Sequence, residues 1–389
     1  MIGKAAPPLP KPVGAYPPLE EIADIRDDLI AFVRSRFAEG LSESFIRSCL
    51  RIGYFEKLGG GLKSSLVGRM TVHVAAVVKR GDAEIPLHEK LMGAGNARSA
   101  SLFSEVLGTM RLSDSDYLML MEDLRKHESL MDRVFSGKRS EDVLSRVIDK
   151  TLAGLYIIHG LDPAAVSDTK PPRDNQIIFT SRLRDKLKDI ITVDPVLKPL
   201  MSSKGHVMQG KCRPLKSLLD STEDWEKENS RVVVRSVVHG DPHLLNVMFR
   251  RYGKGYRVRF IDPNPMLGLV DPAYDVGKLL HFAEAVGWAK REPSVCRASF
   301  SAHGRAGSWH LNGWLNGVAP RIEANRAWFE NRLREKIAKT DLASQAEWSR
   351  RLALARASAH IGLAAIIYPN NKTVGRFVLS HALNALSEW

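Results

Sequence analysis

The sequence predicts an α+β fold, with a small antiparallel sheet in the N-terminal part and a larger, mainly helical C-terminal part. Three observations lead to this prediction. Apolar residues form short strand-like runs between about residues 50 and 122. From about residue 123 onward they recur at helical spacing, and one strand pair, between residues 237 and 262, interrupts the helical part. The 389 residues are enough for two domains or for one large domain with two lobes.

The N-terminal third begins with a proline-rich stretch. Residues 1–18 hold six prolines, which predict an extended arm. The segment from there to Gly40 has apolar residues at helical spacing and predicts a helix. Two strand-like runs, "CLRIGYFEKL" and "SLVGRMTVHVAAVVKR", then flank the turn-like "GGGLKSS". We therefore divide the chain into an arm (1–18), a helix and sheet (19–122) and a helical part (123–389).

The remaining elements follow from the same periodicities. The stretch "LHEKLMGAG" predicts a helix, "DYLMLMEDL" a short buried strand, and "EDVLSRVIDKTLAGLYIIHG" a long helix. Residues 163–235 are charged and mostly helical in pattern. The segment 237–262 predicts strand, loop, strand, turn and strand, and the rest of the chain, to Trp389, is expected to be helical.

Composition narrows the class of protein. The hydrophobic fraction of 44% and the charged fraction of 26% are those of an ordinary globular chain. The three cysteines lie far apart without a CxxC pair, which fits a reducing compartment. No secretory signal and no apolar run of about 18 residues is present, so we expect a cytoplasmic protein without a membrane span. The net charge of +13 favours anionic partners.

The stretch "VVHGDPHLLNVMFR" carries the strongest chemical signal. Asp241 and Asn246 lie five residues apart on one predicted loop, and Asp262 directly follows the strand-like "VRFI". Phosphoryl transfer from a nucleotide needs a carboxylate for the attacking hydroxyl and oxygen ligands for Mg²⁺. Pairing of the strands around the turn "GKG" would bring Asn246 close to Asp262.

These residues resemble a known group of enzymes. "HGDPHLLN" is similar to the HxDxxxxN loop of the aminoglycoside phosphotransferase and choline kinase superfamily, and "FIDPNPMLGLVDPAYD" is similar to its next signature. The resemblance implies a protein-kinase-like, two-lobed fold with the active site between the lobes. It also implies that Asp241 is the catalytic base, that Asn246 and Asp262 bind Mg²⁺, and that His239 and Asp275 brace the loop through hydrogen bonds.

A Gly-rich turn precedes these motifs. Backbone amides of such a turn approach phosphates closely, because glycine has no Cβ. By its position relative to the other motifs we expect the turn to bind the nucleotide, through Gly59, Gly60, Gly61, Ser64 and Ser65.

Further nucleotide-binding residues follow from the resemblance. Lys79 ends an apolar strand and would pair the phosphates, held by a glutamate for which Glu89 is the choice and Glu84 the alternative. The strand "YLMLMEDL" resembles the hinge strand, where the backbone of residues 121–123 (Met121, Glu122, Asp123) would meet the purine.

The sequence thus predicts a kinase that transfers phosphate from ATP or GTP, with Mg²⁺, to a hydroxyl of a small molecule. Residues 169–235, where relatives build the acceptor pocket, hold fourteen Lys or Arg against nine Asp or Glu. This favours a neutral or anionic acceptor, such as a sugar, sugar phosphate or nucleoside, and an aminoglycoside-type antibiotic kinase is the first alternative. A protein kinase, or a nucleotide-binding regulator with little turnover, is the second. The basic stretch "RRYGKGYRVR" leaves a nucleic-acid-binding protein as the third.

Overall fold

The computed structural model describes most of the chain from residue 50 onward. The described residues are 50–57, 68–74, 76–81, 84–93, 97–113, 116–122, 124, 126–138, 141–162, 179–208, 210–229, 236–264, 269–303 and 308–389. The expected arm, the helix before Gly40 and the Gly-rich turn lie outside them. The chain forms two units, one of residues 1–82 and 105–124 (unit 1) and one of residues 83–104 and 125–389 (unit 2).

Unit 1 is built from antiparallel strands, as the strand-like runs of its sequence predict. Strands β1 (Leu50–Lys57) and β2 (Gly68–Val74) form one ladder. Strands β3 (Ala76–Gly81), β5 (Asp116–Glu122) and β4 (Val106–Ser113) form a second sheet in the order β3-β5-β4. In this sheet Lys79 pairs with Met119 and Val77 with Met121. The predicted antiparallel N-terminal sheet is confirmed.

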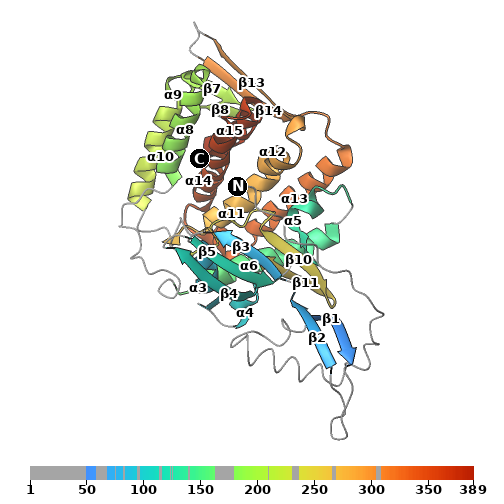
Figure 1. The fold of residues 1–389 in the computed structure, drawn as a ribbon. Coiled ribbons are helices and arrows are strands. Elements are labelled where there is room, and N and C mark those ends of the chain that lie inside the picture. The colour runs from blue at the N-terminus through green and yellow to red at the C-terminus, as the bar shows by residue number, and fades with distance from the viewer. Residues whose placement is uncertain are drawn as a thin grey trace, which may run out of the picture. The chain divides into compact units, whose positions relative to one another are not determined.

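Unit 2 is mainly helical (Figure 1). Its α-helices are α3 (Glu84–Gly93), α4 (Ala97–Ala100), α5 (Leu130–Val134), α6 (Glu141–His159), α8 (Phe179–Val193), α9 (Pro199–Ser202), α10 (Leu215–Asn229), α11 (Ala273–His281), α12 (Gly287–Arg291), α13 (Pro320–Ala338), α14 (Trp348–Ile367) and α15 (Lys372–Ser387). Short 3-10 turns cover Pro195–Leu197, Pro293–Val295 and Asp341–Ser344, and one π-helical turn covers Phe282–Val286. The helices predicted at "LHEKLMGAG" and "EDVLSRVIDKTLAGLYIIHG" are confirmed as α3 and α6.

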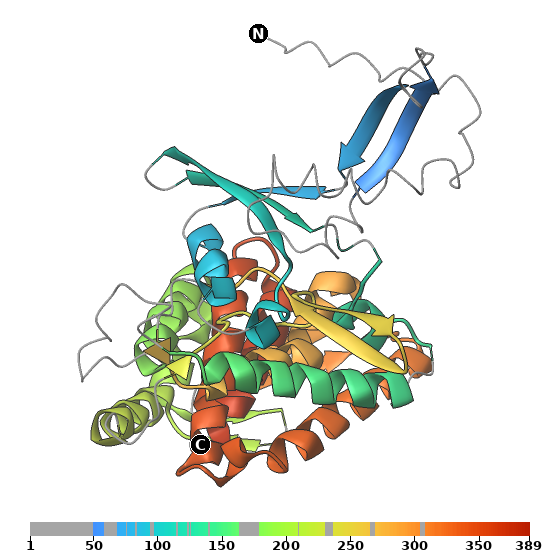
Figure 2. The ribbon, with the colours of Figure 1, turned by 90° about the horizontal axis from the view of Figure 1, so that it is seen from below.

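Helices α14 and α15 pack side by side in the core of unit 2, and α11 and α8 pack on α14. The contact between α11 and α14 is close, because Gly277 leaves room for it. A Cβ at Gly277 would lie 3.0 Å from backbone and side-chain atoms of Ala355. Figure 2 shows α6 running along the hairpin of strands β10 (Val247–Tyr252) and β11 (Gly255–Phe260). The loop of residues 238–246, called the motif loop below, leads into β10. Burial of these apolar faces is the main source of stability, since apolar area removed from water contributes about 25 cal/mol per Å².

The strand pair predicted after residue 237 is confirmed. Strand β9 (Ser236–Val237) pairs with β12 (Leu269–Val270), and β10 (Val247–Tyr252) pairs with β11 (Gly255–Phe260) across a tight turn. The short strand β6 (Glu128–Ser129) adds to the free edge of β10.

The expectation of helix throughout the C-terminal part is wrong at one place. Strands β13 (Cys296–His303) and β14 (Ser308–Leu315) form a hairpin, which joins β7 (Lys204–Val207) and β8 (Gly210–Cys212) in a four-stranded sheet. Along β14 the buried residues alternate with exposed ones, but Gly313 occupies a buried position. A Cβ there would lie 2.2 Å from Ser380 Oγ of α15. The strand pattern is therefore hidden by a glycine that the packing of α15 requires.

Candidate active site

The loop between β9 and β10 is held in shape by its own backbone. Gly240 has φ +80°, a conformation that glycine adopts without strain. The amide of His243 donates to the carbonyl of Asp241 (2.8 Å), and the amide of Asn246 donates to the carbonyl of His243 (2.8 Å). The side-chain Nδ2 of Asn246 also donates to the Asp241 carbonyl, at 2.9 Å. These bonds fix the position of Asp241 relative to Asn246.

Asp275, fully buried at the start of α11, ties this loop to the helix. Its Oδ2 accepts from the amide of His239 (2.9 Å) and its Oδ1 accepts from the amide of Gly240 (2.8 Å). The ring Nε2 of His159, on α6, lies 3.0 Å from the same Oδ2. The carboxylate of Asp275 thus joins three segments that are far apart in the sequence.

The side chain of His239 is fully buried and supports the backbone of the loop. Burial lowers the pKa of its imidazole to about 4, so the ring is neutral near pH 7. Its Nδ1 accepts from the amide of Asp241 at 3.2 Å, which leaves the proton on Nε2. The ring stacks on Phe103 with the centroids 6.2 Å apart, and Phe260 packs against it. A neutral, fixed ring of this kind orients the Asp241 backbone without adding charge.

The carboxylate of Asp241 is surrounded by cationic and polar groups. Its Oδ1 lies 3.0 Å from the Lys278 ammonium, and its Oδ2 lies 3.7 Å from Nε2 of His243. Burial raises the pKa of Asp241, but Lys278 and His243 outweigh this effect and hold the pKa below its ordinary value. Asp241 is therefore a carboxylate, able to accept a hydrogen bond, throughout the neutral pH range.

Asn246 and Asp262 lie just beyond the open end of the β10–β11 hairpin, Asn246 directly before β10 and Asp262 two residues after β11. The amide of Ile261 donates to the carbonyl of Asn246 at 3.0 Å, and Asp262 is the next residue, with an exposed side chain. Asp262 has φ +55°, a left-handed conformation that is uncommon for residues other than glycine. Such backbone strain is concentrated at functional sites.

The donor atoms at this position fit Mg²⁺. Because Nδ2 of Asn246 donates a hydrogen bond to the Asp241 carbonyl, Oδ1 of Asn246 is the side-chain atom that can act as a metal ligand. Asp262 adds a carboxylate. Among the described residues no group of three or more His, Cys, Asp or Glu side chains could hold a metal ion. Mg²⁺ usually takes few oxygen ligands from the protein, and water and substrate phosphates complete its coordination shell.

The expected nucleotide-binding residues are only partly described. The Gly59–Ser65 loop and Asp123 lie outside the described residues. The backbones of Lys79 on β3, Met121 on β5 and Glu89 on α3 are described, but their side chains are not. Glu84, the alternative to Glu89, begins α3.

Glu122 is the expected nucleotide-binding residue whose side chain is described. It is buried at the end of β5. Its amide donates to the carbonyl of Glu105 at 2.8 Å.

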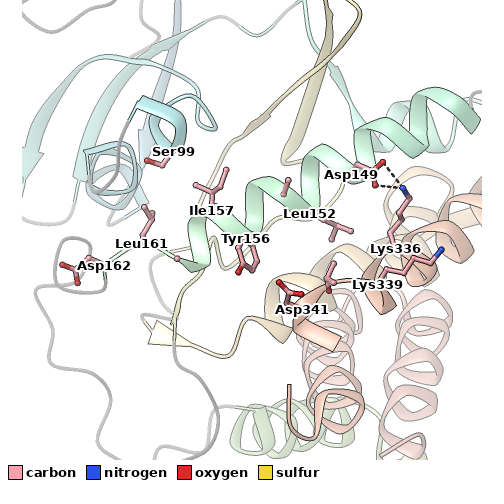
Figure 3. A pocket seen from close by; sticks show the side chains of 13 residues that line it. Ser99, Asp149, Leu152, Tyr156, Ile157, Leu161, Asp162, Lys336, Lys339 and Asp341 are labelled. Carbon is pink, nitrogen blue, oxygen red and sulfur yellow. Dashed lines mark hydrogen bonds and ion pairs between the residues drawn. The ribbon is translucent and has the colours of Figure 1, made fainter. Parts of the chain in front are cut away.

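Unit 2 contains cavities at two places. One, of about 990 Å³, lies over the face of α6 that carries Leu152 and Tyr156, and the ion pair of Asp149 with Lys336 crosses one side (Figure 3). The other, of about 640 Å³, is lined by the paired charges of Glu284 and Arg356. Neither cavity is lined by a residue of the motif loop. No helix among the described residues has the length and apolar character needed to cross a membrane.

Comparison with known proteins gives a likeness to solved structures alone. No protein-family model and no curated protein matches the chain. A proposed aminoglycoside phosphotransferase from Ralstonia eutropha JMP134 is 15% identical, with a TM-score of 0.43, covering 93% of this chain and 96% of that one. A thermostable mutant of the aminoglycoside phosphotransferase APH(4)-Ia, bound to ADP and hygromycin B, is 15% identical, with a TM-score of 0.45 and coverages of 92% and 98%.

A third solved structure is a choline kinase from Cryptosporidium parvum. It is 8% identical, with a TM-score of 0.41 and coverages of 92% and 94%. At identities of 8–15% the chemistry of this chain has to be argued from its own site.

Sequence reasoning missed two residues of the site. Lys278 lies three residues after Asp275 on α11, a spacing that places both side chains on one helix face. This spacing could have indicated Lys278 as a neighbour of the loop. His159 reaches Asp275 from a helix 116 residues earlier, and no local pattern indicates such a contact.

The DPAYD motif supports the site through its first acid as well. Asp271 accepts hydrogen bonds from Nε and Nη2, along one edge of the Arg351 guanidinium, at 2.6 Å each, and from the amide of Ala273 at 2.8 Å. The first acid thus fixes the start of α11 against α14, while the second acid fixes the loop.

Proposed function

We propose that the protein is a phosphotransferase that moves the terminal phosphate of ATP or GTP to a hydroxyl of a small molecule. The observation that supports this most is the geometry of one loop. It combines an ionised carboxylate, Asp241, with an amide, Asn246, that is hydrogen-bonded to the same residue.

Asp241 would act on the acceptor. A carboxylate beside the acceptor hydroxyl accepts its hydrogen bond, aims its oxygen at the terminal phosphate and takes its proton as the new P–O bond forms. A base with a lowered pKa does not remove the proton from the hydroxyl before the new P–O bond begins to form. Its main contribution is orientation, which is the larger part of catalysis in phosphoryl transfer.

Asn246 and Asp262 would hold Mg²⁺ beside the donor. The positive charge that Mg²⁺ supplies when bound would offset the negative charge of the phosphates. The protein's own part is to hold two oxygen ligands at the open end of the β10–β11 hairpin. Asp275 and His239 would keep the loop in place without contacting substrate.

The donor would be bound by the residues of unit 1 and α3. We assign the phosphates to the Gly59–Ser65 loop and Lys79, with Glu89 as the partner of Lys79, and the base to the backbone of residues 121–123. The acceptor would be neutral or anionic, such as a sugar, a sugar phosphate or a nucleoside. The surplus of basic residues between 169 and 235 supports this choice.

A screen for nucleotide consumption tests the proposal. Purified protein is incubated with ATP or GTP, Mg²⁺ and a panel of sugars, sugar phosphates, nucleosides and aminoglycosides. For the acceptor that is used, Asp241→Asn should lower kcat by roughly 10²–10⁴-fold, the usual contribution of a general base. Affinity for a non-hydrolysable nucleotide should stay within a few-fold, because the phosphates are held elsewhere.

Asp220→Asn is the matched control, because Asp220 is a half-exposed acid that pairs with Arg184 on the surface. It should leave the rate unchanged. Full activity of Asp241→Asn would show that the loop does not perform the chemistry. Loss of nucleotide binding in that variant would make Asp241 a structural residue or a metal ligand.

A further inference from the structure

Arg182, on α8, holds its guanidinium in a half-buried position against two other helices. Its NH1 donates to the hydroxyl of Tyr274, on α11, at 3.1 Å. Its NH2 lies against the backbone of α14, where a Cβ at Gly362 would come within 2.4 Å of it. Its Nε is buried and has no hydrogen-bond partner among the described residues. The guanidinium is therefore placed by packing, with part of its hydrogen-bonding capacity unused.

No carboxylate of the described residues forms an ion pair with Arg182. Other arginines of unit 2 are paired: Arg351 with Asp271, Arg356 with Glu284 and Arg376 with Asp194. Withdrawing part of a charge from water without supplying a counter-charge is unfavourable. An arginine that is kept in such a place is consistent with an anion that arrives with a ligand.

Arg182 is linked to the motif loop through two residues of α11. The ammonium of Lys278 lies 5.7 Å from the centre of the Tyr274 ring and 3.0 Å from Oδ1 of Asp241. Burial, and to a lesser extent the charge of Arg182, lower the pKa of Lys278, but Tyr274 and Asp241 raise it more and the side chain stays charged. Contacts from Arg182 to Tyr274, from Tyr274 to Lys278 and from Lys278 to Asp241 thus connect the two cations to the motif loop.

We infer that Arg182 and Lys278 bind an anionic group, a phosphate or a carboxylate, on the acceptor whose hydroxyl Asp241 orients. This inference rests on the proposed phosphotransferase function and narrows the acceptor from neutral or anionic to anionic. The planar guanidinium suits the two oxygens of such a group, and the ammonium adds a point charge beside it. An acceptor anchored there would present its hydroxyl to a carboxylate that already contacts the same lysine.

The same anion chemistry could be supplied by the terminal phosphate of the donor, and the first experiment separates the two sources. Inorganic phosphate is titrated calorimetrically into the wild-type protein, Arg182→Gln and Arg184→Gln, with and without a saturating non-hydrolysable nucleotide and Mg²⁺. We expect phosphate to bind with the nucleotide in place, and Arg182→Gln to weaken it roughly 10–100-fold, the worth of a charged hydrogen bond.

Arg184 is the matched control on the same helix, because it is already paired with Asp220 and Glu223. Its replacement should leave phosphate binding unchanged. If the nucleotide abolishes phosphate binding, and Arg182→Gln weakens the nucleotide, the two cations serve the donor and the inference is wrong. Phosphate binding that does not depend on Arg182 overturns it as well.

The second experiment compares neutral acceptors with related anionic ones that keep free hydroxyls: glucose with glucose 6-phosphate, glycerol with glycerate, and adenosine with its 5′-monophosphate. The charged member of a pair should be preferred at least tenfold in kcat/KM. Arg182→Gln should raise the KM for the charged member while kcat and the KM for the nucleotide stay within a few-fold. Arg182→Lys should restore part of the affinity. Thermal melting of each variant shows that folding is intact.

Gly362→Ala provides a variant that keeps the charge. The added methyl group would collide with NH2 of Arg182, so the guanidinium must move and the KM for the charged acceptor should rise. Turnover that depends on Asp241 but is confined to neutral acceptors would leave the phosphotransferase standing and refute the anion site. If phosphate binding depends on Arg182 but no turnover depends on Asp241, the anion site would stand and the phosphotransferase would be refuted.

Discussion

The ammonium of Lys278 lies 3.0 Å from Oδ1 of Asp241, and the two side chains are only 11% and 27% exposed. The pair is therefore shielded from water far more than an ordinary surface ion pair. Each partner depends on the other to neutralise its charge, so the residue proposed as the catalytic base also has a structural role. The catalytic and structural contributions of Asp241 can be separated by experiment.

Asp241→Asn should destabilise unit 2, because it leaves the Lys278 ammonium in a largely buried place without its acid. We expect a loss of about 1–3 kcal/mol, below the 3–5 kcal/mol for a fully buried pair, since Asp241 is partly exposed. The double variant Asp241→Asn with Lys278→Met should recover most of this loss, because it removes the unpaired charge too. Thermal melting of the four proteins in the cycle measures the coupling.

The activity of the double variant is the control for this cycle. It should stay as low as that of Asp241→Asn, because restoring stability does not restore a carboxylate at the acceptor hydroxyl. Equal stability of Asp241→Asn and wild type would show that the ion pair contributes nothing to folding. Recovered activity in the double variant would show that the low rate came from misfolding.

The sequence contained the site's local features but not its long-range contacts. The interval between Asp241 and Asn246, and the strand ending at Asp262, are local patterns, and so the hairpin that carries them was predictable. Lys278 follows Asp275 by less than one helical turn and could have been deduced from its spacing. The contacts of Asp275 with His159 and of Tyr274 with Arg182 join segments 116 and 92 residues apart, and only the packing of unit 2 creates them.

The fold shows the same division between local and distant information. Strands and helices with regular spacing were predicted, because burial on one face imposes the period of the element. Strand β14 was missed, because Gly313 stands where a larger apolar residue would have shown the alternation. Glycine is required at position 313 because α15 packs closely against the strand there. Helix α15 lies more than 50 residues later in the chain, so the sequence of the strand alone does not indicate this requirement.

Asp275→Asn should lower stability and activity together. The carboxylate accepts from two loop amides and contacts His159 Nε2, and it is fully buried. An amide keeps one acceptor oxygen but turns an NH2 group towards a donor, so one buried amide of His239 or Gly240 loses its partner. Unsatisfied buried groups of this kind are unfavourable by about 1–3 kcal/mol each. Melting curves, and kcat on the acceptor identified by the screen, measure the two effects.

Asp271→Asn is the comparison for that variant. Asp271 is also buried, but its side chain accepts hydrogen bonds from Arg351 and Ala273 and not from the amides of His239 and Gly240. Its replacement should lower the melting temperature with a smaller effect on kcat at temperatures where the protein is folded. If both variants lowered kcat equally in the folded state, Asp275 would have no special role in positioning the loop.

Asp262→Asn should abolish Mg²⁺-dependent nucleotide binding while folding survives. The side chain is exposed, so its loss removes little packing. Asparagine tolerates the left-handed φ of +55°, whereas alanine adds backbone strain of about 1–2 kcal/mol. Titration of a non-hydrolysable nucleotide with Mg²⁺ and with EDTA gives the measurement: wild type should bind far more tightly with Mg²⁺, and Asp262→Asn should bind equally weakly in both.

Asp262→Ala shows whether strain matters in addition to charge. It should lose the same Mg²⁺ dependence and melt at a lower temperature than Asp262→Asn. Retention of Mg²⁺-dependent binding by both variants would remove Asp262 from the metal site. Retention by Asp262→Asn alone would mean that its amide oxygen is a sufficient ligand.

Stability should fall in acid partly through Asp194, a buried carboxylate that joins α8 to α15. Its Oδ2 accepts from the Tyr368 hydroxyl at 2.9 Å and from Arg376 at 2.6 and 3.1 Å. Burial raises the pKa of Asp194, but the hydrogen bonds from Arg376 and Tyr368 prevail and hold the pKa below its ordinary value. The folded state thus binds the proton less tightly than the unfolded state.

A carboxyl group with a lowered pKa stabilises the fold above its unfolded pKa of about 3.9, and this contribution is lost as the pH falls through the lower, folded value. Asp194→Asn should therefore be less stable than wild type at pH 7, and the difference should shrink below about pH 4. Denaturant unfolding at pH 7, 5, 4 and 3 measures it. Asp189→Asn, at an exposed acid of the same helix, should show almost no difference at any pH. A difference for Asp194→Asn that persists unchanged at pH 3 would contradict the linkage, because the stabilising charge would then not be the one that titrates.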